Sequence, residues 1–373
     1  GFCSFLNRSV HASMDPSSSS SASTSPVKSV VVVGGTHGNE YTGVWVSKAL
    51  QRRLDRGDYV DKSFQLATVI GNPLALEHNR RFIDEDLNRQ FSFKALQAES
   101  TTTHEPQTNE AKRAAELNEL LGPKNFEDDP ETCRQPPKTD LIIDLHTTTT
   151  NMGTTLIIAQ GDPLTAQMAA YVKRKCPPEC RVSILMHTHK NQKERPHLSS
   201  IAPHCFSIEA GPVAQGVIRQ DIVDQTQQAL DRALEFIDRL NKEPEKLQQE
   251  LLEGESRLPC WVSAASQRPG EISSKIAWPS DPEHVNFPQW MVHSSVQDKD
   301  FELIHEGDPL FVDLDNNVIP YNGSHGSPIR LMFINEGGYY YASSGTGISV
   351  ANLRYFDVET GTLLPEEETG SAK

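Results

Sequence analysis

The chain is poor in cysteine and in basic residues, and it contains no long apolar run. Its 373 residues include six cysteines at irregular spacing, which argues against a disulfide framework and favours a reducing, cytoplasmic compartment. No apolar stretch approaches the roughly 20 residues that a membrane helix needs, so no membrane span is expected. Lysine and arginine number 35 against 50 acidic residues, and the resulting formal charge of -15 disfavours nucleic acid and anionic membranes as partners.

Composition divides the chain into four segments. Residues 1–27 are rich in serine and poor in acidic groups, which predicts a disordered leader, although the same composition suits an organelle transit peptide. Residues 28–243 are predicted to form the main α/β domain. Residues 244–360 contain short runs punctuated by proline and glycine, which predict a smaller β-rich domain, and residues 361–373 are expected to be a disordered tail.

The main domain alternates apolar runs with amphipathic stretches. The all-valine run at 30–33, which ends at Gly34 and Gly35, predicts a strand buried on both faces. This rhythm of strands and helices is typical of an α/β fold with a largely parallel sheet. Further strands are predicted at 66–71, 141–145, 155–159, 182–186 and 206–208, and helices at 40–53, 109–121, 164–175 and 221–240. Beyond residue 241 few helices are expected, and short strands are predicted at 310–314, 329–334 and 347–350.

A metal-ligand motif follows the valine strand directly. In the sequence GGTHGNE, His37 and Glu40 are separated by two residues, so on a turn that enters a helix both side chains can converge on one ion. Neutral imidazole and carboxylate are ligands typical of catalytic zinc. A glycine-rich turn between a strand and a helix also binds phosphate groups, but this one lacks the spacing and the Gly-Lys-Ser/Thr ending of such loops.

His146 is the best candidate for a third ligand. It closes the strand LIIDLH, and side chains at the carboxyl end of a parallel strand point into the crevice that α/β proteins use for ligands. Three protein ligands would leave a coordination position open for water, as catalytic zinc requires. Asp144 is expected to orient one of the ligand histidines.

A carboxylate and an arginine-containing stretch complete the candidate site. Glu209 ends the apolar strand FSIEAG, where an unpaired carboxylate would be costly unless it had a function. We expect it to act as the general base that accepts a proton from water. The stretch RRFIDEDLNR at 80–89 supplies positive charge suited to carboxylates and oxyanions, although a stretch of mixed charge is more often a solvated loop.

Several motifs together resemble a known family. The sequences GGTHGNE, RFIDEDLNR, DLHTTTTNMGTTL, SIEAGPVAQGVIR and FINEGGYYY occur in this order in the aspartoacylase family, which includes the aminoacylase that acts on N-acyl aromatic amino acids. The resemblance spans about residues 30–341. It implies a zinc-carboxypeptidase-like mixed sheet, mostly parallel, with helices on both faces, and a C-terminal β-rich domain that caps the active site.

The resemblance also implies an activity and a role for each site residue. The activity is the zinc-dependent hydrolysis of N-acyl amino acids to a carboxylate and a free amino acid, with one zinc ion per subunit and a homodimer or larger homo-oligomer as an option. His37, Glu40 and His146 would hold zinc, Glu209 would move the proton, and Arg81 would polarise the scissile carbonyl. The residues implied to bind the substrate are Arg81, Asn88, Arg89, Glu209 and Tyr339.

The sequence departs from the family pattern where the substrate's side chain would bind. Counting back from Glu209, the position where aspartoacylase has an arginine is occupied by Ser199, and Arg195 lies nearby. Strict specificity for N-acetylaspartate is therefore not expected. Both residues are candidates for contact with the substrate.

Other interpretations stay open. Another zinc deacylase or a carboxypeptidase acting on small peptides would use the same metal and the same base, and a zinc-binding module with an inactive site would retain the ligands alone. Cys176 and Cys180 could in principle hold a metal, but no second pair follows at zinc-finger spacing. Four further histidines are predicted to lie on the surface or in loops: His187, His189, His197 and His204.

Overall fold

The structure, a computed structural model, describes residues 26–98, 108–124, 136–188, 191–264 and 273–365. The predicted leader up to residue 25 lies outside these ranges, as do His189 and the end of the predicted tail. Val27, assigned to the leader, is instead buried, and its amide donates to Asn241 Oδ1 at 3.0 Å.

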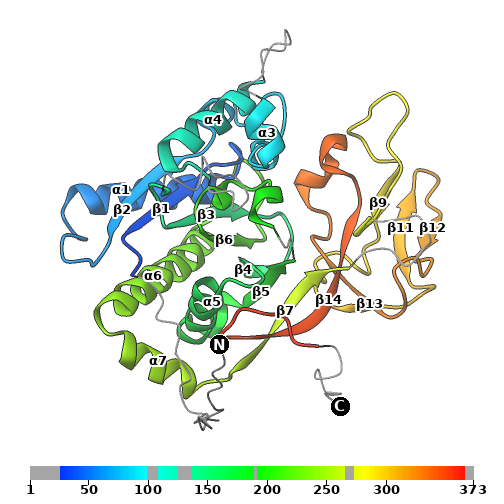
Figure 1. The fold of residues 1–373 in the computed structure, drawn as a ribbon. Helices are drawn as coiled ribbons and strands as arrows, with labels where there is room; N and C mark the ends of the chain where they lie inside the picture. The colour runs from blue at the N-terminus through cyan, green and yellow to red at the C-terminus, as the bar shows by residue number, and fades with distance from the viewer. Residues whose placement is uncertain (1–25, 99–107, 125–135, 189–190, 265–272, 366–373) are drawn as a thin grey trace, which may run out of the picture.

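One sheet runs through most of the molecule in the order β10-β13-β14-β7-β5-β4-β6-β3-β1-β2, with β8 paired to β14 (Figure 1). Strands β2, β1, β3 and β6 are mutually parallel, β4 is antiparallel to β6, and β5 and β7 continue parallel to β4. The predicted mostly parallel, mixed sheet is thus confirmed for the main domain. Its strands are β1 (Ser29–Gly34), β2 (Gln65–Ile70), β3 (Leu141–Thr147), β4 (Gly153–Ala159), β5 (Val182–His187) and β6 (His204–Gly211).

Helices cover both faces of this sheet, as expected. On one face α1, α5 and α6 pack against the strands and against one another, and α7 follows α6 (Figure 1). On the other face α4 packs beside α3 and the short helical turns that precede β6. The helices are α1 (Tyr41–Asp55), α2 (Pro73–Glu77), α3 (Phe93–Ala98), α4 (Asn109–Leu121), α5 (Pro163–Lys175), α6 (Gln220–Lys242) and α7 (Pro244–Leu252).

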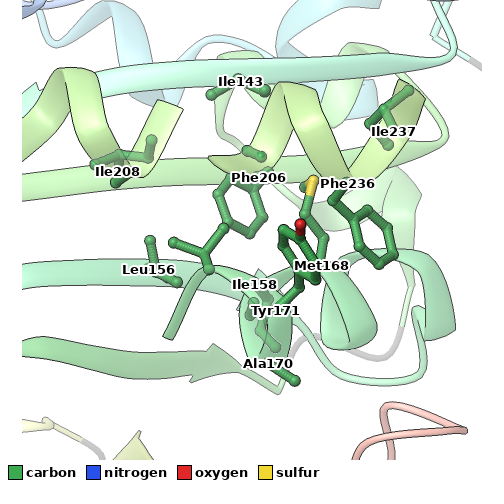
Figure 2. Packing of buried hydrophobic residues seen from close by; sticks show 14 of the residues in the cluster. Ile143, Leu156, Ile158, Met168, Ala170, Tyr171, Phe206, Ile208, Phe236 and Ile237 are labelled. Carbon is green, nitrogen blue, oxygen red and sulfur yellow. The ribbon is translucent and has the colours of Figure 1, made fainter. Parts of the chain in front are cut away.

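The valine strand shows why the sheet is buried on both sides. Val30 and Val32 join the larger apolar cluster under α1, α5 and α6, whereas Val31 and Val33 join the cluster under α4. Successive side chains of a strand point to opposite faces, so a continuous apolar run requires cover on both. In the larger cluster, side chains of α5 and α6 such as Tyr171 and Phe236 pack onto the strands (Figure 2), with these two ring centroids 5.7 Å apart.

The C-terminal part is rich in strands but is not separate from the main sheet. Strands β7 and β14 extend that sheet beyond β5, while β12, β11 and β9 form a second, three-stranded sheet (Figure 1). Strands from both sides of residue 243 therefore share one sheet, and the boundary at this residue stays a prediction. The strands are β7 (Arg257–Ser263), β8 (Lys275–Ile276), β9 (Trp290–Val292), β10 (Leu303–Ile304), β11 (Pro309–Asp313), β12 (Val318–Pro320), β13 (Ile329–Met332) and β14 (Ile348–Asp357).

One helix is present among the few expected in this part, and one local expectation differs from the structure. The charged segment after residue 243 forms α7, because Leu247 and Leu251 recur four positions apart and are buried. Residues 361–365, expected in the disordered tail, are instead part of the fold: Leu363 packs against the larger apolar cluster, and the amide of Leu364 donates to the carbonyl of Tyr355 at 2.9 Å.

Candidate metal centre and active site

The turn after β1 depends on glycine for close contacts with two helices. A Cβ atom on Gly34 would lie 2.2 Å from the carbonyl oxygen of Gly43 in α1, and one on Gly38 would lie 2.1 Å from the carbonyl carbon of Ala75 in α2. No other residue fits these positions without moving the backbone. The turn thereby presents His37 and Glu40 at the start of α1, above the carboxyl end of the strand.

His37, Glu40 and His146 form a buried group that could hold a metal ion. One ligand atom from each lies within 4.8 Å of the others. The Nδ1 atoms of both histidines face the same carboxylate: His37 Nδ1 is 2.6 Å from Glu40 Oε1, and His146 Nδ1 is 3.1 Å from Glu40 Oε2. Two imidazoles and one carboxylate are a ligand set that catalytic zinc uses. The residues present therefore fit the expected metal.

Two buried aspartates orient the opposite nitrogen of each histidine. His37 Nε2 lies 3.0 Å from Asp86 Oδ1, and His146 Nε2 lies 2.9 Å from Asp144 Oδ2. The hydroxyl of Thr36 in turn donates to Asp144 Oδ1 at 2.7 Å. A carboxylate on the far nitrogen fixes the tautomer and the direction of a ligand imidazole. The contact predicted for Asp144 is present, whereas the sequence did not single out Asp86.

Arg81 is buried between two of these carboxylates. Its Nη1 donates to Glu40 Oε1 and its Nη2 to Asp86 Oδ2, both at 3.2 Å, while its Nε is buried without a hydrogen-bond partner among the described residues. Burial disfavours the charge, but Asp86 and Glu40 outweigh it and raise the pKa of Arg81. Burial likewise opposes ionisation of Glu40, yet His37 and His146 hold the pKa of Glu40 below its usual range. The alternative of a solvated loop therefore does not hold for Arg81.

Glu209 lies beside the metal group on the neighbouring strand. In the parallel pairing of β3 and β6 it is in register with His146, so the two side chains share a face of the sheet. Burial raises the pKa of Glu209 to about 8, partly offset by His146. A carboxyl group with a pKa in this range is suited to accepting and releasing a proton near neutral pH.

A single cavity of about 210 Å³ brings the predicted site residues together. Its walls come from the strands and turns of the main domain and from the C-terminal part. The cavity is lined by every residue that the sequence analysis placed in the site: His37, Glu40, Arg81, Asn88, Arg89, His146, Arg195, Ser199, Glu209 and Tyr339.

Tyr339 and Lys275 contribute from the C-terminal part. Tyr339 lies in a short 3₁₀ helix at 337–340, and its hydroxyl accepts from Ser349 Oγ at 3.1 Å. Lys275 Nζ lies 3.2 Å from the centroid of the Tyr339 ring and donates to the carbonyl of Gly345 at 2.7 Å. Burial lowers the pKa of Lys275 to about 7, as do Arg89 and Arg81 nearby. Nothing in the local sequence around Lys275 indicated that this residue lines the cavity.

Of the described histidines expected on the surface or in loops, His197 lies in a loop, whereas His187 and His204 lie at the ends of strands. His187, at the end of β5, and His197 both line the cavity and are half-buried, with their ring centroids 4.8 Å apart. His187 ends a parallel strand, the same signal that selected His146, so sequence reasoning could have found it. His204 begins β6, and its Nδ1 lies 3.0 Å from Asp162 Oδ1.

The second metal interpretation, at the cysteine pair, gains no support. Cys176 and Cys180 are both buried and free. Burial raises the pKa of Cys176 to about 12 and also raises that of Cys180, so both thiols are held in the protonated form that binds metal poorly. Within the described part of the chain, the His37 group is the one cluster of this kind.

Family profiles match both halves of the chain. The succinylglutamate desuccinylase/aspartoacylase catalytic domain matches residues 26–237, and the AstE/AspA barrel-sandwich hybrid domain matches residues 271–347. The chain belongs to the succinylglutamate desuccinylase/aspartoacylase family. The predicted resemblance is thus confirmed, and the two matches fall on either side of the expected boundary.

Individual relatives in this family cover nearly the whole fold. The N-acyl-aromatic-L-amino acid amidohydrolase (carboxylate-forming) of Xenopus laevis is 36% identical over 84% of this chain and 92% of its own length. The aspartoacylase of Rattus norvegicus is 35% identical over 84% of this chain and 90% of its own length. Among solved structures, murine aminoacylase 3 superposes with a TM-score of 0.72 at 26% identity, covering 92% of this chain and 99% of that one.

No helix among the described residues combines the length and the apolar character needed to cross a membrane.

Proposed function

We propose that this family member is a zinc-dependent amidohydrolase that converts N-acyl amino acids, N-acetyl amino acids first among them, to a carboxylate and a free amino acid. The observation that carries the proposal is the cavity in which the buried His37, Glu40 and His146 group, Arg81 and Glu209 meet. The names of the relatives, aspartoacylase and N-acyl-aromatic-L-amino acid amidohydrolase, support the same reaction.

Each residue has a distinct task in this proposal. His37, Glu40 and His146 would hold zinc, which would supply Lewis acidity there. Glu209 takes a proton from the attacking water and passes it to the leaving amine, as its raised pKa favours. Arg81 stabilises the developing oxyanion, which its unpartnered buried Nε supports.

The remaining polar residues of the cavity would hold the amino acid part of the substrate. Asn88, Arg89 and Tyr339 would bind its α-carboxylate, and Lys275 adds a cation close to Arg89. Arg195 and Ser199 would contact its side chain. A cavity of about 210 Å³ with a wall from the C-terminal part favours small substrates over peptides.

A panel of substrates tests the proposal. Protein stripped with a chelator and protein reloaded with zinc would be assayed against N-acetylaspartate, neutral and aromatic N-acetyl amino acids, and blocked dipeptides. We expect zinc to restore turnover of N-acetyl amino acids, and His146→Ala to lose both the metal and the activity. Active protein without near-stoichiometric zinc, or faster turnover of blocked dipeptides, would overturn the assignment in favour of the rival interpretations.

The compartment and the assembly belong to the proposal as well. Four described cysteines, Cys176, Cys180, Cys205 and Cys260, are free and buried, which suits a reducing, cytoplasmic environment. A homodimer or larger homo-oligomer stays a prediction, and sedimentation of the purified protein would test it.

A further inference from the structure

A fully buried lysine lies just beyond the end of α4. Lys124 is 0% exposed, and its Nζ donates to the carbonyls of Phe91 and Arg195, both at 2.6 Å, and to Ser200 Oγ at 2.7 Å. An ammonium group has three donors, so these contacts use its full capacity. A buried cation is costly unless it is paired or hydrogen-bonded, as Lys124 is here. Burial accordingly lowers the pKa of Lys124 to about 7.

The three acceptors belong to the two segments that line the substrate end of the cavity. Phe91 closely follows Asn88 and Arg89, while Arg195 and Ser200 flank Ser199. More than 100 residues separate the two segments, yet they lie together: the amide of Leu198 donates to Asn88 Oδ1 at 2.8 Å with a sequence separation of 110. Lys124 thus connects the residues proposed for the α-carboxylate with those proposed for the side chain.

The first turn of α4 carries a buried carboxylate, Glu110, which binds a different stretch of backbone. Glu110 is 0% exposed, and its carboxylate accepts from the amides of Ile83, Asp84 and Glu85 at 2.8, 3.0 and 3.3 Å. These amides lie between Arg81 and Asp86, on the metal side of the same segment. Residues in and just beyond α4 therefore anchor both sides: Glu110 holds the metal side, and Lys124 holds the substrate side.

We propose that Lys124 is a positioning residue for the substrate: its ammonium fixes the distance between the 88–91 segment and the 195–200 segment, and thereby the fit of the cavity to the amino acid. The proposal rests on the proposed function and deepens it, because it assigns a binding role to a residue that touches neither metal nor substrate. Loss of the Lys124 ammonium should therefore weaken substrate binding, seen as a higher KM, and leave kcat nearly unchanged.

The decisive variant is Lys124→Met, which keeps the length of the side chain and removes the three donors. We expect it to raise KM about 10-fold with kcat changed less than about 3-fold, the pattern of lost binding that is equal in ground and transition states. Zinc content should stay close to wild type, whereas the melting temperature should fall, because three buried acceptors lose their donor. Calorimetric titration with the free amino acid product should show the same loss of affinity without any turnover.

Glu110→Gln, in the first turn of α4, is the matched control. Because Glu110 holds the segment between Arg81 and Asp86, it should lower kcat and zinc affinity more than it changes KM. If Lys124→Met fails to fold, Ser200→Ala removes one acceptor and should still raise KM, by about 3-fold, at unchanged zinc content.

The proposal is wrong if Lys124→Met leaves KM and product affinity at wild-type values, or if it lowers kcat or zinc content as Glu110→Gln does. A wild-type protein that turns over no N-acyl amino acid would instead refute the proposed function. The two failures are distinguishable, because the second appears before any variant is compared.

Discussion

Replacing Asp86 by asparagine tests whether the carboxylate behind a ligand histidine tunes the metal site. The Asp86 side chain is buried, and its two oxygens divide between partners: Oδ1 lies 3.0 Å from His37 Nε2, and Oδ2 accepts from Arg81 Nη2 at 3.2 Å. Burial would raise the pKa of Asp86, but His37 and Arg81 hold it well below its usual range, so the carboxylate is charged at neutral pH. Asp86→Asn keeps the shape and removes that charge.

The expected loss of zinc affinity follows from this contact. Removing the outer partner of a ligand histidine typically weakens metal binding by about 10 to 100-fold, which corresponds to about 1.4 to 2.8 kcal/mol. Since Arg81 also loses one of its two carboxylates, kcat at saturating zinc should fall as well. Asp144→Asn should weaken zinc binding to a similar extent, because Asp144 contacts His146 in the same way.

Zinc affinity would be measured by competition with a chromogenic chelator, and kcat afterwards at saturating zinc. Asp224→Asn, which changes an exposed aspartate of α6, is the control for the loss of one negative charge. If Asp86→Asn and Asp224→Asn bind zinc equally tightly, the contact between Asp86 and His37 has no part in holding the metal, and the reasoning is refuted.

Three further variants test the cavity residues. Glu209→Gln should retain zinc and lose about 10² to 10⁴-fold in kcat, the usual contribution of general acid–base catalysis, and a near-normal kcat would remove Glu209 from the mechanism. Ser199→Arg should raise the ratio of kcat/KM for N-acetylaspartate to that for a neutral analogue by about 10 to 100-fold; an unchanged ratio would indicate Arg195 as the carboxylate partner. Lys275→Met should raise KM for N-acetyl amino acids through the loss of a cation in the cavity, and a wild-type KM would place Lys275 outside the binding site.

Local sequence was sufficient for much of the fold and for part of the site. The valine run at 30–33 predicted a strand covered on both faces, because the burial of alternate side chains depends only on the period of a strand. His37 and Glu40 lie three positions apart on one turn, so their convergence is a property of the local backbone. His146 was found from its place at a strand end, although the same signal at His187 was overlooked.

Tertiary structure alone decided which distant side chains meet. Asp84, Glu85 and Asp86 lie in one acidic run, yet only Asp86 reaches His37, because Glu110 of α4 binds the amides that precede it. The pairing of β3 with β6 brings His146 beside Glu209, and the extension of the sheet through β7 and β14 joins a part of the chain that the sequence suggested was a separate domain. Local propensity carries no information about such contacts, since they depend on the order of strands and on packing between segments far apart in the chain. For the same reason the sequence showed Lys124 and Lys275 only as charged residues. In the folded protein Lys124 donates hydrogen bonds to two distant segments, and Lys275 lines the cavity.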